Sequence, residues 1–167
     1  MTKINKFTRD NLNQQGFGQL DDEMKSRYVI PLRFSPIVGT LLVIVGLALK
    51  SPIWIGSMAL IALSGVLFPR GMVIDVIYNL GVGKLFHAPV LPPTPKPRQF
   101  SYLLSTILLT ASALSYHYSL TLLGLILGGI VVTGGAILSA SLWCLGSWFL
   151  QVVLQACSIK ETLKGRI

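Results

Sequence analysis

The chain contains two cysteines, Cys144 and Cys157, and these thiols are its most reactive side chains. On one helix, thirteen positions separate the two residues by about 220° of rotation and about 20 Å of rise. A disulfide requires alpha carbons less than about 7 Å apart, so the two residues cannot pair within one helix. The cytoplasmic side of a membrane is reducing in most cells, and we expect both thiols to be free.

Cys144 lies between two tryptophans in the stretch SLWCLGSWF, residues 141–149. An isolated cysteine in an apolar helix is usually a small apolar filler, and we favour that interpretation. The alternative is a catalytic thiol, in which Cys144 stays exposed to cytoplasmic donors and takes part in redox or sulfur-handling chemistry.

Other chemistry-bearing patterns are incomplete. A haem between helices needs two axial ligands at matched depth, whereas His87 falls on the predicted cytoplasmic side and His117 lies near an outer turn. The glycines of Gly81-Val82-Gly83-Lys84 lack the remaining parts of a phosphate-binding loop. We therefore expect no cofactor and no metal site, and the sequence favours a protein that is not an enzyme.

Composition identifies the elements that carry these residues as membrane helices. Hydrophobic residues make up 52% of the chain and charged residues only 12%, and the apolar residues form long blocks without charge. Such blocks cannot cover the surface of a soluble domain of this size. We expect an all-α, integral membrane four-helix bundle with interfacial amphipathic segments.

The charge-free blocks place the four spans at about 34–49, 53–68, 101–116 and 119–142. A tight turn at Ser51 and Pro52 makes the first two spans an antiparallel hairpin. The spans belong to a transmembrane domain of residues 34–156, which includes a cytoplasmic segment, 69–100. A polar cytoplasmic segment, 1–33, precedes this domain, and a basic cytoplasmic tail, 157–167, follows it.

The basic residues set the orientation. Six Lys and Arg lie in residues 1–33, one in the first turn, four in residues 69–100 and three after Cys157. Positive charge collects on the cytoplasmic side, so four crossings with both termini inside place thirteen of the fourteen basic residues there. The net charge of +8 then suits anionic lipid headgroups and requires no nucleic acid.

The composition of the spans excludes an ion-coupled transporter and gives little support to a carrier for small neutral solutes. They contain none of the carboxylates, histidines or arginines with which ion-coupled transporters move their substrates. A carrier for small neutral solutes would need a polar path, and hydroxyls for it occur at Thr106, Thr110, Thr133 and Ser139. We consider this the least supported function.

Small residues form a stripe on the fourth helix. On one continuous helix a single face carries Gly124, Gly128, Gly135, Ser139 and Gly146. Such stripes allow helix backbones to approach closely in lipid. We favour packing within the bundle, and a homodimer seam is the alternative.

The end of the fourth helix carries interfacial features. Trp143 and Trp148 are expected at the cytoplasmic interface, where tryptophan anchors helices. Beyond them, Ser147, Gln151 and Gln155 recur every four residues against apolar neighbours, which predicts an amphipathic extension at the headgroups. In the cytoplasmic segment, residues 71–89 predict a short helix on the membrane face, and the following VLPPTPKPRQF predicts a rigid connector.

Several short motifs together resemble one family. RFSP opens the hairpin, LFPRG follows the second span, PPTPKPRQF precedes the third, and a Cys-x-Gly motif ends the fourth. In this order they resemble the bacterial membrane proteins grouped as domain-of-unknown-function family 4395, over about Arg33 to Phe149. The resemblance implies a terminal Cys-x-Gly-Cys. Cys144 and Gly146 match it, whereas Ser147 replaces the second cysteine, and no established activity accompanies the family.

These observations favour an uncharacterised multi-pass protein of the bacterial cytoplasmic membrane. Our first hypothesis is a non-enzymatic structural or accessory subunit, whose cytoplasmic rim contacts anionic lipid, a membrane-protein partner or a second copy of the chain. The second is the thiol-linked component that uses Cys144.

Overall fold

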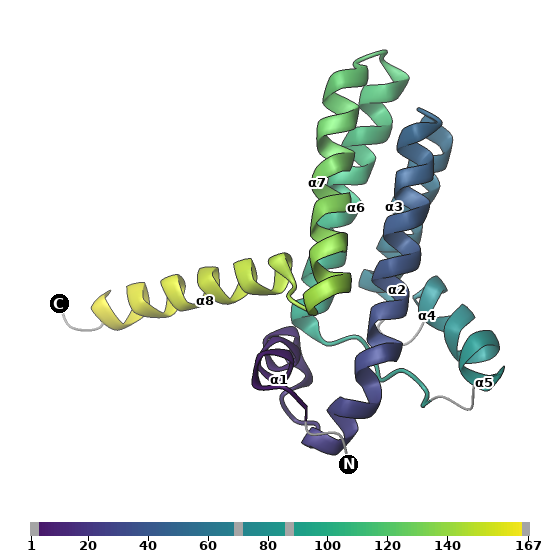
Figure 1. The fold of residues 1–167 in the computed structure, drawn as a ribbon. Helices are drawn as coiled ribbons and strands as arrows, with labels where there is room; N and C mark the ends of the chain where they lie inside the picture. The colour runs from purple at the N-terminus through teal and green to yellow at the C-terminus, as the bar shows by residue number, and fades with distance from the viewer. Residues whose placement is uncertain (1–3, 69–71, 86–88, 165–167) are drawn as a thin grey trace.

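All the regular structure in the described part of the chain is helical. A computed structural model describes residues 4–68, 72–85 and 89–164. Four long helices lie side by side (Figure 1), namely α2 (Asp22–Ala48), α3 (Pro52–Leu67), α6 (Lys96–His117) and α7 (Thr121–Ser141). The expected all-α class is confirmed, and two of the helices, α2 and α7, are long and apolar enough to cross a membrane.

Tight turns connect the long helices in pairs. Between α2 and α3, Lys50 adopts a left-handed conformation with a φ of 50°, and Ser51 caps α3 by accepting a hydrogen bond of 3.3 Å from the Trp54 N–H. Pro52 then occupies the first turn of α3, where its missing N–H costs nothing. Between α6 and α7, Ser119 is left-handed with a φ of 62°. Both pairs are therefore antiparallel hairpins.

Helix α2 is longer than the predicted first span. It begins at Asp22, twelve residues before the charge-free block, and passes through Pro31 and Pro36. Proline has no N–H to donate to the carbonyl four residues earlier, so Pro36 leaves the Leu32 carbonyl without its helical partner. That carbonyl becomes part of the site described below.

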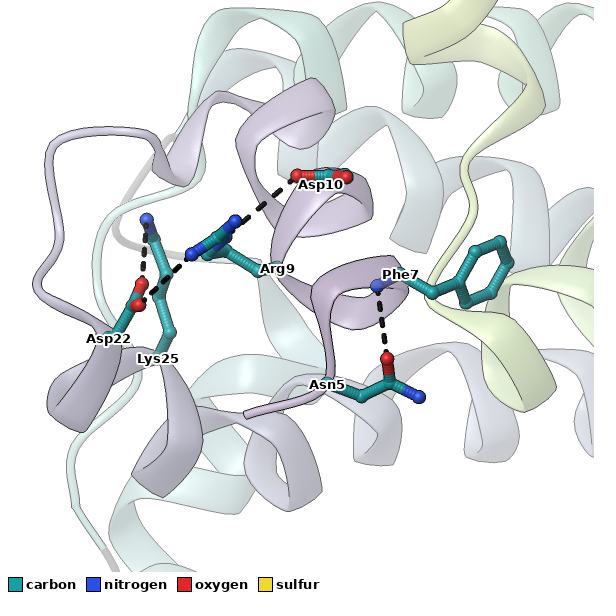
Figure 2. Close-up of polar contacts among 6 residues, drawn as sticks. All are labelled: Asn5, Phe7, Arg9, Asp10, Asp22 and Lys25. Carbon is teal, nitrogen blue, oxygen red and sulfur yellow. Dashed lines mark hydrogen bonds and ion pairs between the residues drawn. The ribbon is translucent and has the colours of Figure 1, made fainter. Parts of the chain in front are cut away.

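The N-terminal segment folds against the end of the bundle rather than remaining a purely polar extension. It forms α1 (Lys6–Leu12) and η1 (Asn13–Phe17), a π-helical stretch that kinks at Gly16 with a φ of 98°. An ion pair of 3.4 Å between Asp22 and Arg9 ties α1 to the start of α2, and Asp22 forms a second ion pair, of 3.9 Å, with Lys25 within α2 (Figure 2). One buried apolar cluster combines Leu12, Phe17, Leu32, Tyr78, Leu91 and Leu142.

The fourth long helix ends in a sharp break. Leu142 is left-handed, with a φ of 54°, and a new helix, α8 (Leu145–Lys164), begins three residues later. Figure 1 shows α8 running away from the bundle, across the direction of α7. The N-terminal segment holds this break, because Asn11 donates to the Ser141 carbonyl at 2.8 Å and Gln15 donates to the Leu142 carbonyl at 2.6 Å.

Short helices fill the connection between α3 and α6. These are α4 (Val73–Ile77), η2 (Tyr78–Val82) and α5 (Gly83–Leu85). The proline-rich stretch after them lacks regular structure as far as Pro95 and leads directly into α6. Two polar side chains of this connection are hydrogen-bonded: Asp75 accepts from Ser35 of α2, and Asn79 accepts a hydrogen bond of 2.9 Å from the Leu91 N–H.

Candidate functional site

The break between α7 and α8 positions Cys144. Its carbonyl accepts a hydrogen bond of 2.9 Å from the Trp148 N–H, so Cys144 is the N-cap residue of α8. The side chain is buried, with 3% of its surface exposed, and its sulfur lies 2.9 Å from the Ser101 Oγ of α6. The exposure to cytoplasmic donors that the catalytic alternative assumed for Cys144 is therefore wrong, because α6 covers the thiol.

A close approach of two backbones brings the thiol to α6. A Cβ on Gly146 would lie only 2.8 Å from the Ser101 Cα. Ser147, in turn, places its hydroxyl 3.4 Å from that of Ser101. The first turn of α8 thus rests directly on α6, and only glycine fits at the contact.

A buried arginine lies one turn before this contact. Arg98 is 3% exposed, and its guanidinium donates to the Tyr102 hydroxyl at 3.1 Å and to the Leu32 carbonyl at 3.5 Å. The second acceptor is the carbonyl that Pro36 leaves free in α2. A proline in one helix and an arginine in the next therefore form one interhelical hydrogen bond.

Neighbouring groups keep the guanidinium charged. Burial by itself lowers the pKa of Arg98, but Tyr102, Asp75 and Cys144 raise it, and the pKa lies above its usual value. Asp75 belongs to α4 and is engaged by the hydroxyl of Ser35. Among the described residues, neither Arg98 nor Asp75 has an ion-pair partner within 4.0 Å, so the two charges compensate each other at longer range.

A cavity of about 190 Å³ begins at this polar cluster and extends between α2, α3, α6 and α7. Its polar end is formed by Ser35, Ser101, Tyr102 and Cys144. Above them the walls are almost entirely apolar, with side chains such as Val43, Met58, Leu109 and Val131. The arrangement can hold an apolar molecule with a hydrogen-bonding group at one end.

The predicted small-residue stripe is divided between two helices. Gly124, Gly128 and Gly135 lie on α7, where a Cβ would meet Tyr116, Leu47 and Thr40, respectively. Ser139 donates to the carbonyl of Gly135 within α7. Gly146 belongs to α8, so the continuous helix expected through it is wrong, and this glycine packs on α6 instead.

The remaining predicted residues lie apart from the cavity. The rings of Trp143 and Trp148 are 6.2 Å apart, and Trp148 is exposed. His117 contacts Tyr118 at the far end of α6, whereas His87 and the side chain of Cys157 lie outside the described residues. No cluster that could hold a metal ion occurs in the part of the chain that the structure describes.

Sequence reasoning missed Arg98, Tyr102, Ser35 and Asp75 as a group. From the sequence, Arg98 is only one of the four basic residues of segment 69–100 that set the orientation, and Asp75 is only one residue of the short helix expected within 71–89. One signal was available, because Pro36 inside an apolar helix requires an external donor for the Leu32 carbonyl.

One comparison with known proteins gives a match. The model of the family described as Domain of unknown function (DUF4395) matches residues 29–155. No curated protein and no solved structure matches the chain.

Proposed function

We propose that the chain, which belongs to the DUF4395 family, is a four-crossing membrane protein of the bacterial cytoplasmic membrane, with both termini cytoplasmic and a non-enzymatic accessory role. The observation that carries the proposal is the surface of the bundle. Large aliphatic side chains are exposed on all four long helices, for example at Leu41, Leu60, Ile107 and Leu122. Soluble monomers rarely expose apolar surface of this extent, whereas lipid covers it at no cost.

Helix α8 fits the membrane interface in the same arrangement. At 100° per residue, an arc of about 140° carries five exposed apolar side chains, those of Leu145, Trp148, Phe149, Val152 and Val153, whereas the exposed Leu154 lies outside this arc. On another side of the helix, Gln151 donates to the Gln14 carbonyl of η1 at 3.0 Å. An amphipathic helix held in this way lies with its apolar arc in the acyl boundary and the N-terminal segment beneath it.

The surroundings of Cys144 and Arg98 support a structural role for the polar cluster. The thiol is covered by Ser101, and the guanidinium is bound to Tyr102 and a backbone carbonyl. These contacts join α2, α6 and α8 at one level. The cluster thereby fixes the angle at which α8 leaves the bundle, and this angle presents the cytoplasmic rim, residues 71–100 and α8, to lipid or to a partner.

The membrane and accessory parts of the proposal are tested in two steps. The chain should stay in the membrane pellet after carbonate extraction at high pH, and in mild detergent it should migrate in an assembly with a partner at fixed stoichiometry. Release by carbonate would contradict membrane integration. A chain that remains strictly monomeric in native membranes after cross-linking would contradict the accessory role.

The thiol-linked alternative retains one supporting observation, since Cys144 also lines the cavity. In a Cys157→Ser background, the accessory proposal predicts that maleimide labels Cys144 only after unfolding. Rapid labelling of the native protein, together with loss of function in Cys144→Ser, would favour the thiol chemistry instead.

A further inference from the structure

The cavity is long and narrow, and it runs parallel to the helices. Its lining extends from Ser35 to Val43 on α2, from Ser101 to Leu109 on α6 and from Ile130 to Leu138 on α7. Eight residue steps on each helix correspond to a length of about 12 Å. A volume of about 190 Å³ spread over that length gives the cavity the elongated shape of a single extended chain.

Hydroxyl groups without partners face this space. Most serines and threonines in the long helices donate to a carbonyl of the preceding turn, as Thr106 does to Tyr102 at 2.8 Å. Thr40 and Ser105 line the cavity, yet neither forms a hydrogen bond within the described residues. Tyr102 accepts from Arg98 and has its own proton left to donate. At the polar end, Tyr102 can therefore donate a hydrogen bond to an oxygen atom of a ligand, and Thr40 and Ser105 offer further hydroxyls about one turn farther along the cavity.

The cavity also reaches the surface of the bundle. Two of its lining residues, Leu104 on α6 and Ile130 on α7, are themselves exposed. In the arrangement proposed above, this surface faces the acyl chains of the bilayer. A ligand can thus enter sideways from the membrane without crossing water.

We propose that the cavity binds one acyl chain of a membrane lipid, with its ester or carboxyl oxygens at Tyr102 and its hydrocarbon directed toward Leu109. The proposal rests on the membrane location inferred above. A slender apolar cavity stays free of water, and while it is empty the side chains that line it lack dispersion contacts on that side. An acyl chain restores these contacts in the direction in which lipid chains already lie, and the polar end coincides with the cytoplasmic headgroup level.

Two glycines on α7 provide a matched test. Gly134 lines the cavity, and a Cβ there would meet only the Leu145 Cδ1, at 3.9 Å, so Gly134→Leu projects a side chain into the space. Gly129 has nothing within 4 Å of such a Cβ and does not line the cavity, so Gly129→Leu adds the same side chain elsewhere on α7. The purified full-length chain and both variants are released from phosphatidylglycerol nanodiscs containing oleic acid and analysed by native mass spectrometry.

We expect one retained acyl lipid on the natural chain and on Gly129→Leu, and at least a fivefold lower occupied fraction on Gly134→Leu. The mass of the adduct distinguishes phospholipid from free fatty acid. Equal occupancy in all three proteins, or no adduct on the natural chain, would overturn the proposal. If Gly134→Leu loses its helical circular dichroism, Gly134→Ala replaces it, with an expected loss of about twofold and with unchanged occupancy as the contrary result.

Carbonate extraction of the same proteins separates this inference from the proposed function. A chain that resists extraction yet carries no acyl lipid would overturn the ligand alone. A chain that is extracted by carbonate would overturn both proposals.

Discussion

Replacing Gly146 by alanine should destabilise the fold through the contact between α6 and α8. The added methyl group would lie 2.8 Å from the Ser101 Cα and 2.5 Å from its Oγ. The hydroxyl can rotate, but the Cα belongs to the backbone of α6, so the two helices must separate. At Gly128, by contrast, the obstacle is the end of the Leu47 side chain, which can change its rotamer.

The magnitude follows from two opposing terms. Overpacking of this kind costs about 1–3 kcal/mol, and a contact with backbone belongs near the upper value. Alanine recovers up to about 1 kcal/mol of helix propensity. The net loss is about 2 kcal/mol, which for a chain of this size lowers the melting temperature by about 4–8 °C.

Gly129→Ala is the control, because its methyl group would meet nothing within 4 Å. Only the propensity term remains, so this variant should gain about 0.5–1 kcal/mol. Thermal unfolding in one detergent, followed by circular dichroism, measures both variants against the natural chain. A Gly146→Ala variant as stable as Gly129→Ala would show that α8 does not rest on α6 as described.

Three further changes test other parts of the bundle in the same thermal assay. Gly135→Leu should strongly destabilise the protein, because the new side chain meets Thr40 of α2. Ile126→Leu, on the exposed face of α7, is the control and should change the free energy of unfolding by less than about 0.5 kcal/mol. Equal tolerance of both changes would show that α2 and α7 do not pack closely at Gly135. Arg98→Leu should cost about 1–3 kcal/mol by leaving the Leu32 carbonyl without a donor, and an unchanged melting temperature, equal to that of exposed Lys96→Leu, would contradict the interhelical bond. Cys144→Ser should change stability by less than about 1 kcal/mol and leave function intact, and loss of function in a folded protein would favour the thiol chemistry.

The long helices could be predicted from the sequence because their cause is local. Blocks without charge identify the apolar segments, and Ser51-Pro52 marks the start of a helix. The break after α7 could not be predicted in this way. Leu142 adopts a left-handed conformation that leucine rarely takes, and it is held there by Gln15 from the other end of the chain.

The polar cluster was missed for a related reason. The pattern of charges uses Arg98 only as one of the basic residues that set the orientation. It carries no information on which backbone carbonyl the guanidinium contacts. Only the combination of Pro36 in α2 with an arginine at the start of α6 defines the bond. Likewise, the polar composition of the N-terminal segment concealed Leu12 and Phe17, whose burial depends on a partner more than one hundred residues away.

Cysteine accessibility in intact cells tests the central claim of a four-crossing bundle most directly. In a background with Cys144→Ser and Cys157→Ser, single cysteines are placed in the two outer turns by Lys50→Cys and Tyr118→Cys, and on the inner side by Lys6→Cys and Lys96→Cys. A membrane-impermeant maleimide should label the first two in intact cells and the last two only after lysis. Labelling of the Lys6 or Lys96 position in intact cells, or protection of both turns, would contradict the arrangement.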